Sequence, residues 1–229
     1  QVRLIPWHRL VQLPEDLGFE QAAAMMLQGM TARYLLHGCF AVGQGHVVLV
    51  HAAAGGVGSL LTQWSRYKGA TIIGTAGSPE KIERARKNGC HHPVNYQEED
   101  FVARVKEITE ERGVDVVYDG VGRATFMKSL DCLKPMGTMV SFGQASGKVE
   151  PFEPTLLAAK GSLFLTRPSL MDYTKQREDL LAHAEDLFQA YRSGAVEIAI
   201  GQSYPLSEAG TAHTDLENRR TMGSTVLIP

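Results

Sequence analysis

The chain has 229 residues, of which 44% are hydrophobic and 21% charged, with 23 Lys and Arg against 25 Asp and Glu. This composition is typical of a globular protein with its own core, and the net charge of −2 excludes the strongly basic surface of most nucleic-acid-binding proteins. The three cysteines are widely spaced, so neither a disulfide framework nor a cysteine-rich zinc site is predicted. We therefore expect a metal-free protein in a reducing, cytoplasmic compartment, with no signal peptide and no membrane span.

The beginning of the sequence reads as the interior of a protein. The first residue is Gln1, and residues 1–20 are irregular, with two prolines and a glycine between short apolar stretches. We therefore expect the chain to be an N-terminally shortened piece of a longer protein. From Phe19 to Phe40 the apolar residues recur with helical spacing, which predicts a helix.

Helices and strands alternate over the rest of the chain. An apolar, β-branched run over residues 46–51 predicts a strand that is buried on both faces of a sheet. Further strands are expected over residues 71–75, 93–96, 114–118, 138–142 and 162–166. Helices are expected over residues 56–68, 79–87, 98–110, 124–133 and 176–191. This order predicts an α/β fold with a doubly wound, six-stranded parallel sheet of the Rossmann type.

A glycine-rich turn follows the first predicted strand directly. Residues 52–58 read AAAGGVG, so Gly55 and Gly58 stand at the second and third glycine positions of the G-x-G-x-x-G motif, and Ala53 stands at the first. A dinucleotide pyrophosphate binds at a helix N-terminus, where unpaired N–H groups attract it and side chains would block its approach. The position of the turn between a strand and a helix therefore predicts a dinucleotide-binding loop that includes Gly56 and Val57.

The end of the second strand indicates which dinucleotide binds. An NAD-binding domain usually has an acidic residue here, but this chain has Thr75, followed by Gly77 and Ser78. The absence of an acid permits a 2′-phosphate, and Lys81 and Tyr96 are the predicted clamp for it. The alternative roles are a solvated helix lysine and an edge-packing aromatic side chain. We predict NADPH as the cofactor.

Several other chemistries are not supported by the sequence. The Tyr-x-x-x-Lys motif of short-chain reductases is missing, since Arg177 stands four residues after Tyr173. The adjacent pair His91 and His92 is expected to be a solvated loop pair, because neighbouring residues of an extended segment point in opposite directions. His51 is expected to be a strand-end histidine. No catalytic residue is assigned, so the source of the proton stays open.

Six segments carry a more specific likeness. They are HAAAGGVG at 51–58, GSPEK at 77–81, VNYQEEDF at 94–101, VVYDGVG at 116–122, VSFGQASG at 140–147 and KGSLFLTRPSL at 160–170. Together they resemble the zinc-independent quinone oxidoreductases, the zeta-crystallin-like branch of the medium-chain dehydrogenase/reductase superfamily. The resemblance runs from about residue 4 to residue 229.

The resemblance implies a set of residues around the cofactor. They are Thr31, Gly55, Gly56, Val57, Gly58, Gly77, Ser78, Lys81, Tyr96, Val121, Phe142, Gly143, Ser169, Leu170 and Arg219. Core packing is the alternative role for Val121 and Phe142. No residue is expected to bind a metal.

The resemblance also implies a domain organisation. Residues 1–22 would be the tail of a truncated GroES-like β domain, residues 23–205 the NADP-binding Rossmann domain, and residues 206–229 a segment that returns toward the catalytic domain. Two subunits would pair through the sixth strand, residues 161–166, to form a homodimer.

The expected function is NADPH-dependent reduction of a quinone by hydride transfer without a metal. Two alternatives stay open. The chain could reduce α,β-unsaturated ketones or enoyl substrates, which share the scaffold and cofactor. It could also be a non-enzymatic NADPH-binding module, like the crystallin or RNA-binding relatives, although it has no basic excess or RNA-binding motif.

Overall fold

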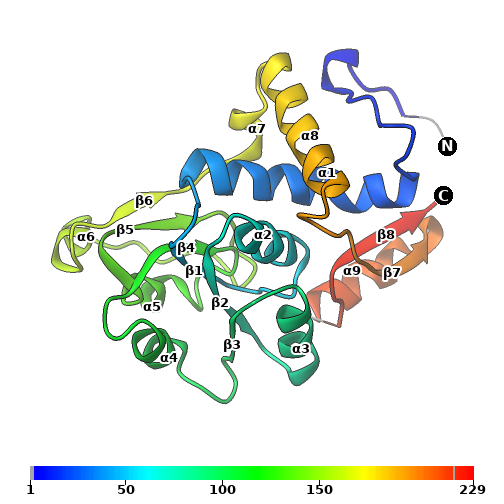
Figure 1. Ribbon diagram of the computed structural model, residues 1–229. Coiled ribbons are helices and arrows are strands. Elements are labelled where there is room, and N and C mark those ends of the chain that lie inside the picture. Colours follow the sequence, from blue (N-terminus) through cyan, green and yellow to red (C-terminus); the bar gives the residue numbers. More distant parts are fainter. Residues whose placement is uncertain (1–2, 219) are drawn as a thin grey trace.

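The structure, a computed structural model, describes residues 3–218 and 220–229 (Figure 1). Its centre is a six-stranded parallel sheet with the strand order β3-β2-β1-β4-β5-β6. The strands are β1 (Val47–Val50), β2 (Thr71–Ala76), β3 (His92–Asn95), β4 (Val114–Asp119), β5 (Leu133–Ser141) and β6 (Phe164–Thr166). The predicted doubly wound parallel sheet is confirmed.

Helices cover both faces of this sheet (Figure 1). They are α1 (Phe19–Tyr34), α2 (Gly56–Tyr67), α3 (Pro79–Lys87), α4 (Phe101–Ile108), α5 (Phe126–Leu130), α6 (Thr155–Ala159), α7 (Leu170–Tyr173) and α8 (Arg177–Arg192). Core residues of α1 and α2 pack on one face and those of α4 and α5 on the other, while α8 packs on the outer side of α1 (Figure 1). No helix of the described ranges combines the length and apolarity that crossing a bilayer requires.

The strand side chains divide between the two layers by simple alternation. In β1, Val48 and Val50 belong to the core under α1 and α2, while Leu49 belongs to the core over α4 and α5. All three are completely buried. Both faces of β1 are covered, which is why its four residues form a continuous apolar run.

Three helices end or begin elsewhere than predicted. Asp100 caps α4 by accepting the Val102 N–H at 3.3 Å, so the preceding acidic residues lie outside the helix. The predicted helix over residues 124–133 is the shorter α5, and Leu133 already belongs to β5. The first helix ends in a wide π-turn, η2 (Leu35–Cys39). There the buried Tyr118 hydroxyl donates to Leu35 O at 3.0 Å.

A separate unit follows α8. It contains β7 (Ile200–Pro205), the short η3 (Leu206–Glu208), α9 (Ala209–Glu217) and β8 (Ser224–Ile228), and β7 and β8 pair in parallel. We call these residues, 200–228, the C-terminal unit. The predicted domain boundary after residue 205 falls between its two strands. The division into domains and the GroES-like origin of the ends stay predictions.

The N-terminal segment lies along α8. Arg177 donates to the carbonyls of His8 and Leu10 at 2.9 Å each, and its guanidinium lies 5.1 Å from the centre of the Trp7 ring. Arg192, at the end of α8, forms a bidentate ion pair with Asp16 at 2.9 and 3.0 Å. These contacts hold η1 (Trp7–Arg9) and the residues after it beside the helix.

Candidate functional site

The predicted site residues gather at one edge of the sheet. The carboxyl ends of parallel strands lie at a common edge, and nearly every predicted residue directly follows one of the six strands. The segments are 55–58 after β1, 77–81 after β2, 96 after β3, 121 after β4, 142–143 after β5 and 169–170 after β6. β1 and β4 are neighbours where the strand order reverses, which is the usual position of a ligand in such sheets.

The turn after β1 ends at the N-terminus of α2. Gly55 is the N-cap of that helix and donates its N–H to Ala52 O at 2.8 Å. The Ser59 N–H then bonds to Gly55 O at 2.8 Å. The N–H groups of Gly56, Val57 and Gly58 come before this first helical bond, so they face out of the helix end and provide a site for an anion.

Gly58 is required by the tightness of this turn. A Cβ atom on Gly58 would overlap Ala52 O, and one on Gly56 would overlap the Gln28 side chain. Ala52 itself has a left-handed backbone with φ of 52°, which tightens the turn further. The result is a cradle of bare backbone at a helix N-terminus, and this geometry fits a dinucleotide pyrophosphate.

The loops after β2 and β3 touch each other. The Ser78 hydroxyl caps α3 by accepting the Lys81 N–H at 3.3 Å. Gly77 lies so close to Tyr96 that a Cβ atom would overlap the phenol oxygen. The predicted phosphate clamp is thus built from two adjacent loops, with the phenol beside the glycine.

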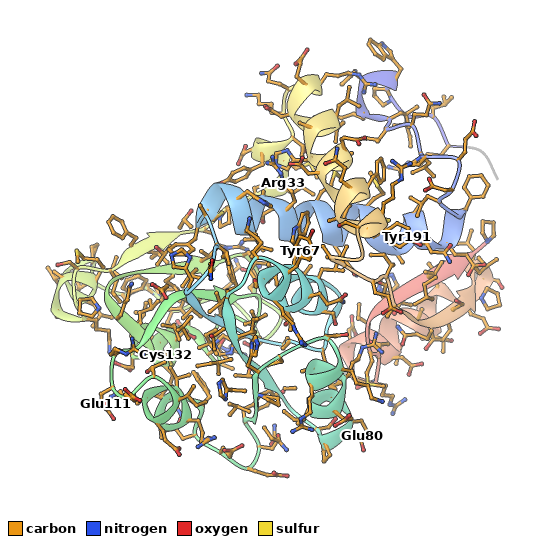
Figure 2. All side chains as sticks on the ribbon, in the orientation of Figure 1. Arg33, Tyr67, Glu80, Glu111, Cys132 and Tyr191 are labelled. Carbon is orange, nitrogen blue, oxygen red and sulfur yellow. The ribbon has the colours of Figure 1, made fainter. Side chains whose placement is uncertain are left out.

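A carboxylate that was not among the predicted residues lies at the same place. Glu80 lies in the first turn of α3 (Figure 2). Hydrogen bonds from its own backbone N–H and from Ser78 lower the pKa of Glu80, so it is ionised at neutral pH. It is fully exposed, and water and salt therefore screen its repulsion of a nearby phosphate.

The loop after β4 is organised by another carboxylate that the sequence analysis did not single out. Asp119 is completely buried and accepts the N–H groups of Val121 at 2.7 Å and Gly122 at 3.0 Å. The Thr125 hydroxyl donates to the same carboxylate at 2.8 Å. The available signal was an Asp at a strand end followed by Gly-Val-Gly, which is typical of a side chain that binds its own turn.

The loops after β4 and β5 are closely joined. The Phe142 N–H donates to Asp119 O at 2.9 Å. A Cβ atom on Gly143 would lie 2.5 Å from Gly120 O, and one on Gly120 would lie 2.9 Å from the Phe142 ring. Phe142 is half-buried against the core, so core packing accounts for part of its position. Val121 is half-buried in the same pair of loops.

Of the remaining predicted residues, three lie in or at the start of helices. Thr31 is buried in α1, and its hydroxyl donates to Leu27 O at 2.7 Å. Ser169 and Leu170 are at the start of α7, where Ser169 is exposed and Leu170 half-buried. Arg219 lies outside the described residues. The contact of each with a cofactor stays a prediction.

Several histidines have hydrogen-bond partners within the structure. His91 and His92 are both exposed, as expected, but His91 accepts the Ile72 N–H at 3.0 Å and His92 is the first residue of β3. His51 lies at the end of β1, as expected, but it is buried between two hydroxyl groups. In the part of the chain that the structure describes, no three His, Cys, Asp or Glu side chains are arranged to hold a metal ion.

Comparisons with known proteins agree with this geometry. The family model of the zinc-binding dehydrogenases matches residues 56–183. The chain is 46% identical to 2-haloacrylate reductase from a Burkholderia species, covering 100% of the chain and 70% of that protein. It is 47% identical to quinone oxidoreductase 1 from Escherichia coli, covering 95% and 67%. The crystal structure of the Escherichia coli quinone oxidoreductase complexed with NADPH matches with a TM-score of 0.93 over 96% of the chain and 68% of that structure.

Proposed function

The chain belongs to the zinc-independent quinone oxidoreductase branch of the medium-chain dehydrogenase/reductase superfamily, and from this we propose that it is an NADPH-dependent quinone reductase that works without a metal. The observation that carries the proposal is the carboxyl edge of the sheet. It joins a bare-backbone cradle at the start of α2 to a strand end without an acid, where Lys81 and Tyr96 stand. The related structure with NADPH supports the same cofactor.

Each part of the edge has a role in holding the cofactor. Gly55 to Gly58 would bind the pyrophosphate through backbone N–H groups, and Gly77, Ser78, Lys81 and Tyr96 would surround the 2′-phosphate. When bound, NADPH supplies the hydride that, with a proton, reduces a quinone to a hydroquinone. The loops of Val121 and Phe142 would orient the nicotinamide, and orientation is the main contribution of the protein to such a reaction.

A second activity has its own support. The Burkholderia relative is named for reduction of 2-haloacrylate, and its identity to the chain is close to that of the quinone oxidoreductase. A conjugated alkene and a quinone both accept hydride at a carbon in conjugation with a carbonyl group. Reduction of an activated alkene is therefore the second candidate function.

The cofactor is tested by calorimetric titration of NADPH and NADH into the wild-type chain, Lys81→Ala and Lys87→Ala. Lys87 is the last residue of the same helix and serves as the matched control. Loss of a charge-assisted contact to the 2′-phosphate should weaken NADPH binding about tenfold or more, without a change for NADH. An unchanged NADPH preference in Lys81→Ala would contradict the role of Lys81. Absence of NADPH binding by the wild-type chain would contradict the proposed function.

The substrate is tested by following NADPH oxidation with 1,4-benzoquinone and with 2-chloroacrylate. Turnover of the quinone at the higher kcat/KM supports the quinone reductase, and the reverse supports the alkene reductase. NADPH binding without turnover of either compound would favour a non-enzymatic NADPH-binding module.

The proposal also includes a homodimeric assembly and a cytoplasmic location. β6 is an edge strand of the sheet, and its apolar side chains Phe164 and Leu165 are 62% and 37% exposed. An exposed apolar edge strand is suited to pairing with a second copy, so we retain the homodimer through β6 as a proposal. Sedimentation of the wild-type chain and of Phe164→Lys tests it. A cytoplasmic location is proposed on the reduced cysteines.

A further inference from the structure

One buried histidine links the end of β1 to β2 and to α5, next to the proposed cofactor site. His51 is the last residue before the turn of residues 52–58, and it is 1% exposed. Its Nδ1 lies 2.9 Å from Thr75 Oγ1, next to the end of β2. Its Nε2 lies 2.8 Å from Ser129 Oγ in α5.

The hydrogen-bond partners determine where the ring carries its proton. The Ser129 hydroxyl donates its hydrogen to Thr125 O at 2.9 Å, so its oxygen accepts from His51 Nε2–H. Nδ1 is then the acceptor for the Thr75 hydroxyl. Burial lowers the pKa of His51, which agrees with a neutral ring. Both ring nitrogens are therefore used, each with one partner.

The same set of bonds continues to the loop after β4. Thr125 accepts the Ser129 hydroxyl through its backbone oxygen, and its own hydroxyl donates to Asp119. Asp119 in turn holds the N–H groups of Val121 and Gly122. We call His51, Thr75, Ser129, Thr125 and Asp119 the strand-end network. It joins the ends of β1, β2 and β4 behind the edge where the cofactor is proposed to bind.

We propose that His51 is a positioning residue for the cofactor, which rests on the proposed NADPH site. The imidazole keeps the pyrophosphate turn, the 2′-phosphate loop and the loop of Val121 at fixed distances from one another, so that one extended dinucleotide meets all three. Its rigidity has a simple source. Both polar atoms of the ring are bonded, and the Phe101 ring packs against it edge-on at 5.0 Å between centres.

Removal of either hydroxyl tests this role without opening a cavity at the histidine. Thr75→Val and Ser129→Ala each detach the ring from one loop. Thr71→Val, at the amino end of the same strand, is the matched control. We expect each detaching variant to weaken NADPH binding about fivefold, the value of one hydrogen bond, while Thr71→Val binds as the wild type does.

The double variant separates positioning from simple loss of stability. If both hydroxyls act through one ring, Thr75→Val with Ser129→Ala should weaken binding by less than the product of the two single effects. Chemical denaturation shows that each protein is folded when it is titrated. Folded Thr75→Val and Ser129→Ala proteins with wild-type affinity would overturn the role of His51 and leave the proposed function intact, and so would fully multiplicative effects. Failure of the wild-type chain to bind NADPH would overturn both.

Discussion

The carboxyl edge of the sheet and the C-terminal unit differ in how closely neighbouring atoms surround each residue, and so in which substitutions each residue can accept. At the edge, Gly58, Gly77 and Gly143 have no room for a Cβ atom, and Asp119 and His51 are buried with every polar partner in place. In the C-terminal unit, β7 alternates between half-buried and exposed residues, and Gly210 has open space around it. Constraint at the edge extends over several loops, whereas in the C-terminal unit it is confined to Gly201 and Gly223, where a Cβ atom would overlap Met222 O and Ala199 O.

The strongest test of this contrast is Gly58→Ala. The new Cβ would overlap Ala52 O, so the turn has to open and the first N–H groups of α2 lose their alignment. We expect loss of NADPH binding and a decrease in the free energy of unfolding on the order of 3 kcal/mol. Calorimetry and urea denaturation measure the two effects. Wild-type affinity in the folded variant would show that the turn is not the pyrophosphate site.

A second test concerns the attachment of the C-terminal unit. The buried Ser224 hydroxyl lies 3.0 Å from Ala24 O and 2.7 Å from Gln28 Oε1, and it links β8 to α1. Ser224→Ala should cost about 1–2 kcal/mol. Amide hydrogen exchange should speed up in β8 and stay unchanged in β4. Ser207→Ala, at an exposed position of the same unit, is the control, and equal exchange in both variants would refute the link.

The two regions should lose stability at opposite ends of the pH scale. Burial lowers the pKa of His51, so the folded ring stays neutral while the unfolded one gains a proton below about pH 6.5. Its contribution to stability is complete above that pH and is lost as the pH falls toward the folded-state pKa. In the C-terminal unit, the hydrogen bond to Asp215 raises the pKa of Tyr204, so that contribution is complete below about pH 10 and is lost as the pH rises further.

Hydrogen exchange at several pH values measures this difference. The residues around β1 should become less protected in acid, and those of β7 and β8 in alkali. Tyr204→Phe should remove the alkaline effect and leave the acid effect. Loss of protection in both regions at the same pH would mean that they unfold as one unit.

The smallest expected effect is an increase in the free energy of unfolding. Gly210 lies in α9 with nothing within 4 Å of the place where a Cβ would be, so Gly210→Ala should raise the free energy of unfolding by about 0.5 kcal/mol through helix propensity. Urea denaturation beside Gly58→Ala gives the comparison directly. A loss of stability in Gly210→Ala would show that this unit is as constrained as the edge.

The same contrast explains what could be read from the sequence. The sheet was predictable because its central strand is an apolar run buried on both faces, and the glycine turn because glycine spacing between a strand and a helix has a steric cause. β7 and α9 were missed because half-exposed segments carry a weak pattern. The strand-end network was missed because a lone His, Thr or Ser in a sequence does not reveal partners far along the chain, such as Ser129 for His51.

The bridge between Gly55 and Gly223 has a consequence for the order of events during synthesis. Gly223 also donates its N–H to Ala54 O at 3.4 Å, so the turn after β1 pairs with a segment that the ribosome adds only after all six strands. Closing so long a loop is slow and comes late in folding. The nascent sheet can therefore form with the turn after β1 still unpaired on one side, and this turn acquires its last backbone neighbour when the residues just before β8 arrive.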